Sequence, residues 1–111
     1  MWAVDIVTVR AGERENYRKF LEANWAKARR TVREQGDIRS YHAAFSPDTG
    51  SANTQVLLLT EYTDSSAYAR REEIFQPVLA AQGRTLIDGK ATRELTERLV
   101  STAYTAVMGQ R

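Results

Sequence analysis

The 111-residue sequence contains no cysteine and only one histidine, His42. The lack of cysteine excludes disulfides, thiolate nucleophiles and zinc–thiolate sites. With a single histidine, a metal site would depend mostly on carboxylate ligands. Glycine-rich phosphate loops, nucleophile elbows and paired metal-ligand motifs are also missing from the sequence. We therefore expect neither a metal nor a bound cofactor.

Long hydrophobic runs and an excess of one charge are lacking as well. The longest aliphatic run, Val56 to Leu59, is far short of the ~20 apolar residues of a membrane helix. Sixteen Lys and Arg against fourteen Asp and Glu leave a net charge of +2, which predicts binding to neither nucleic acid nor membranes. Met1 leads straight into Trp2 without a basic region or a cleavage site, which is typical of a cytoplasmic protein. A chain from which a signal peptide had been removed would look the same.

The residues that are present suit one globular domain, with 42% hydrophobic and 27% charged residues and enough length for one core. We expect a single domain over residues 1–108 and a short tail over 109–111. Strand-like and helix-like segments alternate in the order βαββαβ. β-branched and aliphatic residues predict strands at 2–9, 38–45, 55–62 and about 97–108.

Two helices are expected between these strands. An amphipathic pattern over 13–35 predicts a long helix that ends at Gly36, a typical C-cap residue. Asp64 can cap a second helix over 65–74, after which Pro77 restarts a short helical turn. This order predicts a ferredoxin-like α+β fold, in which both helices cover one face of a four-stranded antiparallel sheet.

The other face of such a sheet should be polar if it meets water. Instead Leu57, Leu58 and Leu59 follow one another, so apolar side chains point to both faces of that strand. Val4 and Ile6 likewise alternate with apolar neighbours on the first strand. Exposing such a face would leave an unusually large apolar patch. We therefore expect a homodimer in which the two sheets face each other.

Four segments resemble the dimeric α/β-barrel superfamily, which includes antibiotic-biosynthesis-type monooxygenases, heme-degrading monooxygenases, stress-responsive barrel proteins and NIPSNAP-like domains. They are Val9-Arg-Ala-Gly12, Glu13-Arg-Glu-Asn-Tyr17, Gly36-Asp-Ile-Arg-Ser-Tyr41 and Val56-Leu-Leu-Leu-Thr-Glu-Tyr-Thr-Asp64. Matching features cover nearly the whole chain except residues 84–95. The resemblance implies a ferredoxin-like dimeric barrel, a fold that hosts many unrelated activities.

The heme-degrading branch of that superfamily lines its pocket with an Asn on strand one, a Trp at the end of strand three and a His on helix two. The corresponding positions here hold Asp5 and Tyr62, and helix two contains no histidine. The resemblance therefore implies no heme degradation by this chain.

Two residues are candidate catalytic bases. Asp5 shares one strand face with Ala3 and Val7, where an unpaired carboxylate is costly and suited to proton transfer. The alternatives are that it reaches the rim of the sheet or pairs with an arginine. His42 is the other candidate, because imidazole is a common general base in proteins, although a lone histidine is more often structural.

Candidate substrate-binding residues are Asn24, Trp25, Tyr62 and Tyr104. Asn24 lies in the apolar stripe of the first helix, with a donor and an acceptor aimed at the sheet, and it can either line a pocket or satisfy local backbone groups. The aromatic residues can hold a flat polycyclic or quinone-like ligand, or they can simply be core. The basic cluster Lys27, Arg29, Arg30 and Arg33 on the first helix could indicate RNA binding. The third strand, however, lacks the exposed aromatic residues of RNA-binding modules with this topology. We therefore expect these basic residues to form a solvated helix face.

Three classes of function stay open at this stage. The first is a cofactor-independent oxygenase or isomerase that acts on a small aromatic or polyketide-like molecule, with Asp5 or His42 as base and Asn24 or Tyr62 orienting the substrate. The second is a small-molecule binding protein without catalysis. The third is a non-catalytic dimeric structural or interaction protein. An open cavity near Asp5 would favour the first two classes, and a filled core would favour the third.

Overall fold

The computed structural model describes residues 1–48, 50 and 53–105. Its strands are β1 (Trp2–Val9), β2 (Ile38–Phe45), β3 (Thr54–Tyr62) and β4 (Thr96–Tyr104). They form one four-stranded sheet in the order β2-β3-β1-β4, and every neighbouring pair is antiparallel. This arrangement confirms the predicted ferredoxin-like α+β fold. The expected tail at 109–111 lies outside the described residues, as does the predicted end of the last strand.

The first helical run is continuous but contains a wider π-helical segment that the sequence pattern did not predict. It consists of α1 (Arg14–Phe20), η1 (Leu21–Ala26) and α2 (Lys27–Gln35). The run ends where expected, because Gly36 adopts a left-handed conformation with φ of 91°. Glycine accepts this conformation without the steric penalty that a Cβ atom brings.

The second helical region consists of α3 (Ser65–Ala69), α4 (Arg71–Gln82) and a separate turn, α5 (Thr92–Leu95). Asp64 caps α3 as predicted, since its Oδ1 accepts the Ala67 backbone N–H at 2.7 Å. The prediction that Pro77 restarts the helix was wrong, because Pro77 lies inside α4. Its position is exposed, so water can satisfy the backbone carbonyl that proline leaves without a partner.

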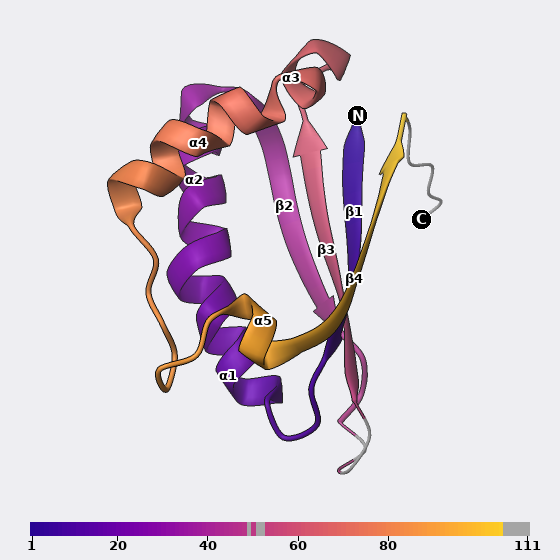
Figure 1. Cartoon of the computed structure of the whole chain (residues 1–111). Helices are drawn as coiled ribbons and strands as arrows, with labels where there is room; N and C mark the ends of the chain where they lie inside the picture. The colour runs from indigo at the N-terminus through magenta and orange to yellow at the C-terminus, as the bar shows by residue number, and fades with distance from the viewer. Residues whose placement is uncertain (49, 51–52, 106–111) are drawn as a thin grey trace.

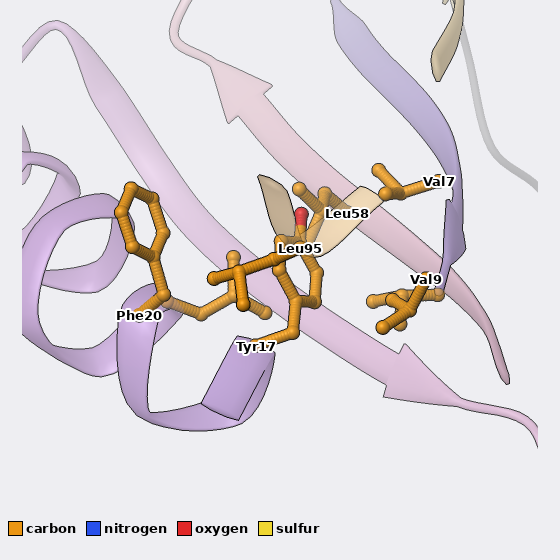
Figure 2. Close-up of a cluster of buried hydrophobic side chains, with 8 residues drawn as sticks. Val7, Val9, Tyr17, Phe20, Leu58 and Leu95 are labelled. Atoms are coloured by element: carbon orange, nitrogen blue, oxygen red, sulfur yellow. The ribbon is translucent and has the colours of Figure 1, made fainter. Parts of the chain in front are cut away.

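All helices lie on one side of the sheet (Figure 1). One buried cluster joins α1 and α5 to β1 and β3, and Figure 2 shows Tyr17 extending from α1 toward Leu58. A second buried cluster joins α2, α3 and α4 to the ends of β2 and β3. Within the described residues no helix is long and apolar enough to cross a membrane.

The opposite face of the sheet, which we call the open face, carries apolar side chains interspersed with polar ones such as Gln55, Glu61 and Arg98. Strand alternation places on it Trp2, Val4, Ile6, His42, Leu57, Leu59 and Val100. The cross-strand row Leu57, Ile6 and Val100 is 41%, 42% and 39% exposed, respectively. No element of the described chain covers this face (Figure 1).

Candidate functional site

A cleft of about 1030 Å³ lies between α3–α4 and the helix side of β1 and β4. It exists because the helices cover β1 but not the edge strand β4: Val7 is 2% exposed, whereas its β4 partner Leu99 is 61% exposed. The cleft is lined by Ala3, Asp5, Arg29, Tyr62, Tyr68, Arg71, Glu72, Phe75, Gln76, Leu79, Ala80, Ser101, Thr102 and Ala103. Its volume lies at the upper end of the range for small-molecule sites.

Asp5 reaches this cleft from β1. Its Oδ1 accepts the Ser101 hydroxyl from the neighbouring strand β4 at 2.7 Å. Within the described residues Asp5 makes no ion pair with an arginine. A carboxylate that is oriented by one hydrogen bond and facing a cleft still has oxygen lone pairs free to accept a proton.

An aromatic wall stands beside Asp5. The Tyr62 ring contacts the rings of Tyr68 and Phe75 edge-on, at centroid distances of 5.5 and 6.5 Å. Burial raises the pKa of the Tyr62 hydroxyl. Burial also raises the pKa of Tyr17 to about 12, and the negative charge of Asp5 adds to this effect. Both phenols are therefore neutral at physiological pH, so each can donate a hydrogen bond.

Arg29 is the residue that the sequence pattern missed. The expectation of a solvated position was wrong, because its side chain is partly buried and lines the cleft. Its guanidinium lies 4.6 Å from the Trp25 ring and 4.8 Å from the Phe75 ring. The spacing of Trp25 and Arg29, four residues apart on a helix, was a signal for this contact.

Asn24 and Trp25, predicted to bind substrate, lie outside the lining of this cleft. The Asn24 amide group instead holds the segment after α4, because its Nδ2 donates to the Thr85 carbonyl and its Oδ1 accepts the Thr85 N–H, both at 2.8 Å. The Trp25 ring packs edge-on against Tyr41 at 5.6 Å. These contacts bring Asn24 and Trp25 to the interior between helix and sheet.

His42 and Tyr104 lie on the open face, opposite the cleft. The exposed His42 ring stacks on Trp2 at a centroid distance of 6.4 Å. The structure thus brings together Asp5 and Tyr62 among the predicted site residues and separates His42 and Tyr104 from them. The roles assigned to His42, Asn24, Trp25 and Tyr104 stay predictions. Within the described part of the chain, no three His, Asp or Glu side chains are grouped to hold a metal ion.

The sequence matches no protein-family model and no curated protein. Solved structures do share the fold. Rv0793 from Mycobacterium tuberculosis gives a TM-score of 0.56 at 18% identity, covering 97% of both chains. Atu4242 from Agrobacterium tumefaciens gives 0.54 at 19% identity, covering 92% of this chain and 89% of its own.

A variant of SnoaB from Streptomyces nogalater, described as a cofactor-independent oxygenase, gives a TM-score of 0.50 at 13% identity. The match covers 98% of this chain and 96% of SnoaB. At such identities the likeness establishes the fold and not the activity. It agrees with the predicted ferredoxin-like α+β fold.

Proposed function

We propose that the cleft binds a small, planar aromatic or polyketide-like molecule and that the protein acts on it as a cofactor-independent oxygenase or isomerase. The observation that carries this proposal is the meeting of an oriented carboxylate, Asp5, with the aromatic wall of Tyr62, Tyr68 and Phe75 in one cleft. Flat ligands stack well on such walls, and a few polar groups then fix their orientation. The shared fold with SnoaB supports the same class of reaction.

In this proposal Asp5 removes a proton from an acidic C–H or O–H group of the ligand. The resulting enolate either regains the proton at another carbon, which is isomerisation, or reacts with dissolved O₂. In the second case its carbon forms a C–O bond to give a peroxide, protonated Asp5 returns the proton to the outer oxygen, and the hydroperoxide breaks its O–O bond and loses water with the remaining hydrogen of that carbon to leave a ketone, which is oxygenation. Tyr62 donates a hydrogen bond that orients the ligand. Positioned general bases contribute about 10²–10⁴-fold to such steps.

The proton-transfer step can be tested with 2-tetralone, a bicyclic aromatic ketone with acidic α-protons. NMR in D₂O measures how fast these protons exchange in the presence of the protein. We expect Asp5→Asn to slow the protein-dependent exchange by about 10²-fold. Glu61→Gln is the matched control, because Glu61 on the open face also accepts a serine hydroxyl, that of Ser40, at 2.9 Å. Equal exchange rates for wild type and Asp5→Asn would refute Asp5 as the base.

A non-catalytic dimeric protein is the second candidate function. The open face favours the dimer, although not the lack of catalysis. We propose that a second copy covers this face, because the exposed row of Leu57, Ile6 and Val100 is apolar and contiguous across three strands. Light scattering at micromolar concentration should give about twice the 12.6 kDa chain mass. Ile6→Lys should return the monomer, since it places a charge at the centre of the row. A wild-type mass that stays near 12.6 kDa as concentration rises would refute the dimer.

A further inference from the structure

Arg29 is held in one orientation at the inner wall of the cleft. Its Nε donates to the hydroxyl of Thr60, a residue that is 2% exposed, at 2.9 Å. The rings of Trp25 and Phe75 lie 4.6 and 4.8 Å from the guanidinium carbon. Contact with two rings and one buried acceptor leaves the guanidinium little rotational freedom, so its remaining donors are preorganised.

The charge of Arg29 has no carboxylate partner within the described residues. The ion pairs there are made by Arg18 and Lys90. Asp5 lines the same cleft but is hydrogen-bonded to Ser101. Burial lowers the pKa of Arg29 to about 10, and the weaker attraction of Tyr62, Asp5 and Tyr17 does not offset this effect. Arg29 therefore stays charged at neutral pH in a partly desolvated position, which is unfavourable without a counter-charge.

The terminal nitrogens of Arg29 face space that a ligand can reach. Only Nε of this guanidinium has a protein partner within the described residues, so the four N–H donors on Nη1 and Nη2 are free. In that same part of the chain, the buried side-chain atoms without partners are Trp25 Nε1 and Gln82 Oε1, and no nitrogen of Arg29 is among them. The free donors are therefore not sealed inside the core but open to the cleft.

We propose that Arg29 binds the carboxylate of the cleft ligand, so that the ligand is a planar aromatic acid and not a neutral aromatic. Two parallel N–H donors on a planar guanidinium match the two oxygens of a carboxylate. The ligand supplies the hydrogen-bonded carboxylate that Arg29 lacks within the described residues, and its ring lies along Tyr62 and Tyr68. This inference rests on the proposed function, because it assumes that the cleft takes a flat aromatic molecule.

The test compares two probes of equal shape, 2-naphthoate and 2-naphthamide, by isothermal titration calorimetry at neutral pH. Wild type should bind the naphthoate about 10-fold or more tightly than the amide, as expected for charge-assisted hydrogen bonds. Arg29→Gln should bind both probes equally. Arg33→Gln is the matched control, because Arg33 also lies on α2 over an aromatic ring, that of Tyr41 at 5.2 Å, but outside the cleft. It should keep the wild-type preference.

Each other outcome has a definite meaning. Equal binding of both probes to wild type overturns the inference and leaves the proposed function intact. Loss of the preference in Arg71→Gln but not in Arg29→Gln also overturns it, because Arg71 is the other cation that lines the cleft. Binding of neither probe at millimolar concentration overturns the inference together with the aromatic ligand. If circular dichroism shows that Arg29→Gln does not fold, Arg29→Lys replaces it in the test. Lysine keeps the positive charge but lacks the paired N–H donors of the guanidinium. An unchanged preference for the naphthoate in Arg29→Lys would refute bidentate binding.

Discussion

Replacing Asn24 by alanine tests whether this residue is an anchor of the fold. Asn24 is 8% exposed, and its amide makes three hydrogen bonds to backbone groups. Nδ2 donates to the carbonyls of Phe20 and Thr85 at 3.1 and 2.8 Å, and Oδ1 accepts the Thr85 N–H at 2.8 Å. These bonds tie the π-helical segment to the chain that leads from α4 to α5.

The expected loss of stability follows from those bonds. Each contributes about 1 kcal/mol net, which sums to about 3 kcal/mol. Thr85 is exposed, so water can replace its two bonds in the variant and reduce the loss. We therefore expect Asn24→Ala to lower the free energy of unfolding by about 2 kcal/mol. Urea denaturation should show a lower midpoint with an unchanged slope.

The matched control is Asn16→Ala, since Asn16 makes one side-chain hydrogen bond, to Glu13 at 3.2 Å, near the start of α1. Its loss should stay within about 0.5 kcal/mol. Both variants are compared at one protein concentration, because dimerisation would make the midpoint concentration-dependent. Equal stability of the two variants would refute the anchoring role. Weaker binding of 2-naphthoate to a stable Asn24→Ala protein would instead support the predicted substrate contact.

Three further predictions follow from local geometry. Gly36→Ala should lower the stability by about 1 kcal/mol, since φ is 91° there; an unchanged thermal midpoint would contradict this. A hydrogen bond from Lys90 lowers the pKa of Glu13 below its usual 4.5, so this carboxylate stabilises the fold above pH 4.5 and stops doing so as pH falls through the lower folded value. The decrease in the urea midpoint from pH 6 to pH 3 should therefore be smaller in Glu13→Gln than in wild type. Finally, we expect no tight hemin complex, because His42 is exposed on the open face. A Soret shift that saturates at one equivalent and disappears in His42→Ala would show otherwise.

The strands were predictable because their signals are local. Residues 2–9 and 38–45 alternate or cluster in β-branched and aromatic side chains, and β1 and β2 have those bounds. The caps at Gly36 and Asp64 followed from residue type alone, since few residues adopt a left-handed conformation or accept backbone N–H groups in this way. The position of Pro77 inside α4 was not predictable, because exposure of the neighbouring carbonyl depends on tertiary packing.

The prediction for Arg29 was wrong because this residue lies at the margin of the apolar stripe. A helical wheel at a uniform 3.6 residues per turn puts Arg29 just beyond the apolar stripe, next to Trp25. The π-helical segment Leu21–Ala26 has wider turns than an α-helix, so the residues on either side of it do not keep the angular spacing of that wheel. Arg29 lines the cleft, while Ala28 and Val32, which the wheel puts in the apolar stripe, are fully buried. The wheel thus predicted the buried stripe of the helix but not the role of Arg29 at its margin, whereas Asp5 was found from the alternation of side chains along a strand.

The cleft and the open face use opposite sides of the same strands, which couples the proposed site to the proposed dimer. Asp5 lies between Val4 and Ile6, and its partner Ser101 follows Val100 on the edge strand. Edge strands have one free side and open more readily than central ones. A second copy packed on the open face would hold Val100, and with it the β4 backbone that presents the Ser101 hydroxyl to Asp5. The carboxylate that we assign as the base therefore depends for its orientation on a surface that it does not touch, and Ile6→Lys should slow proton exchange in 2-tetralone although it replaces no cleft residue.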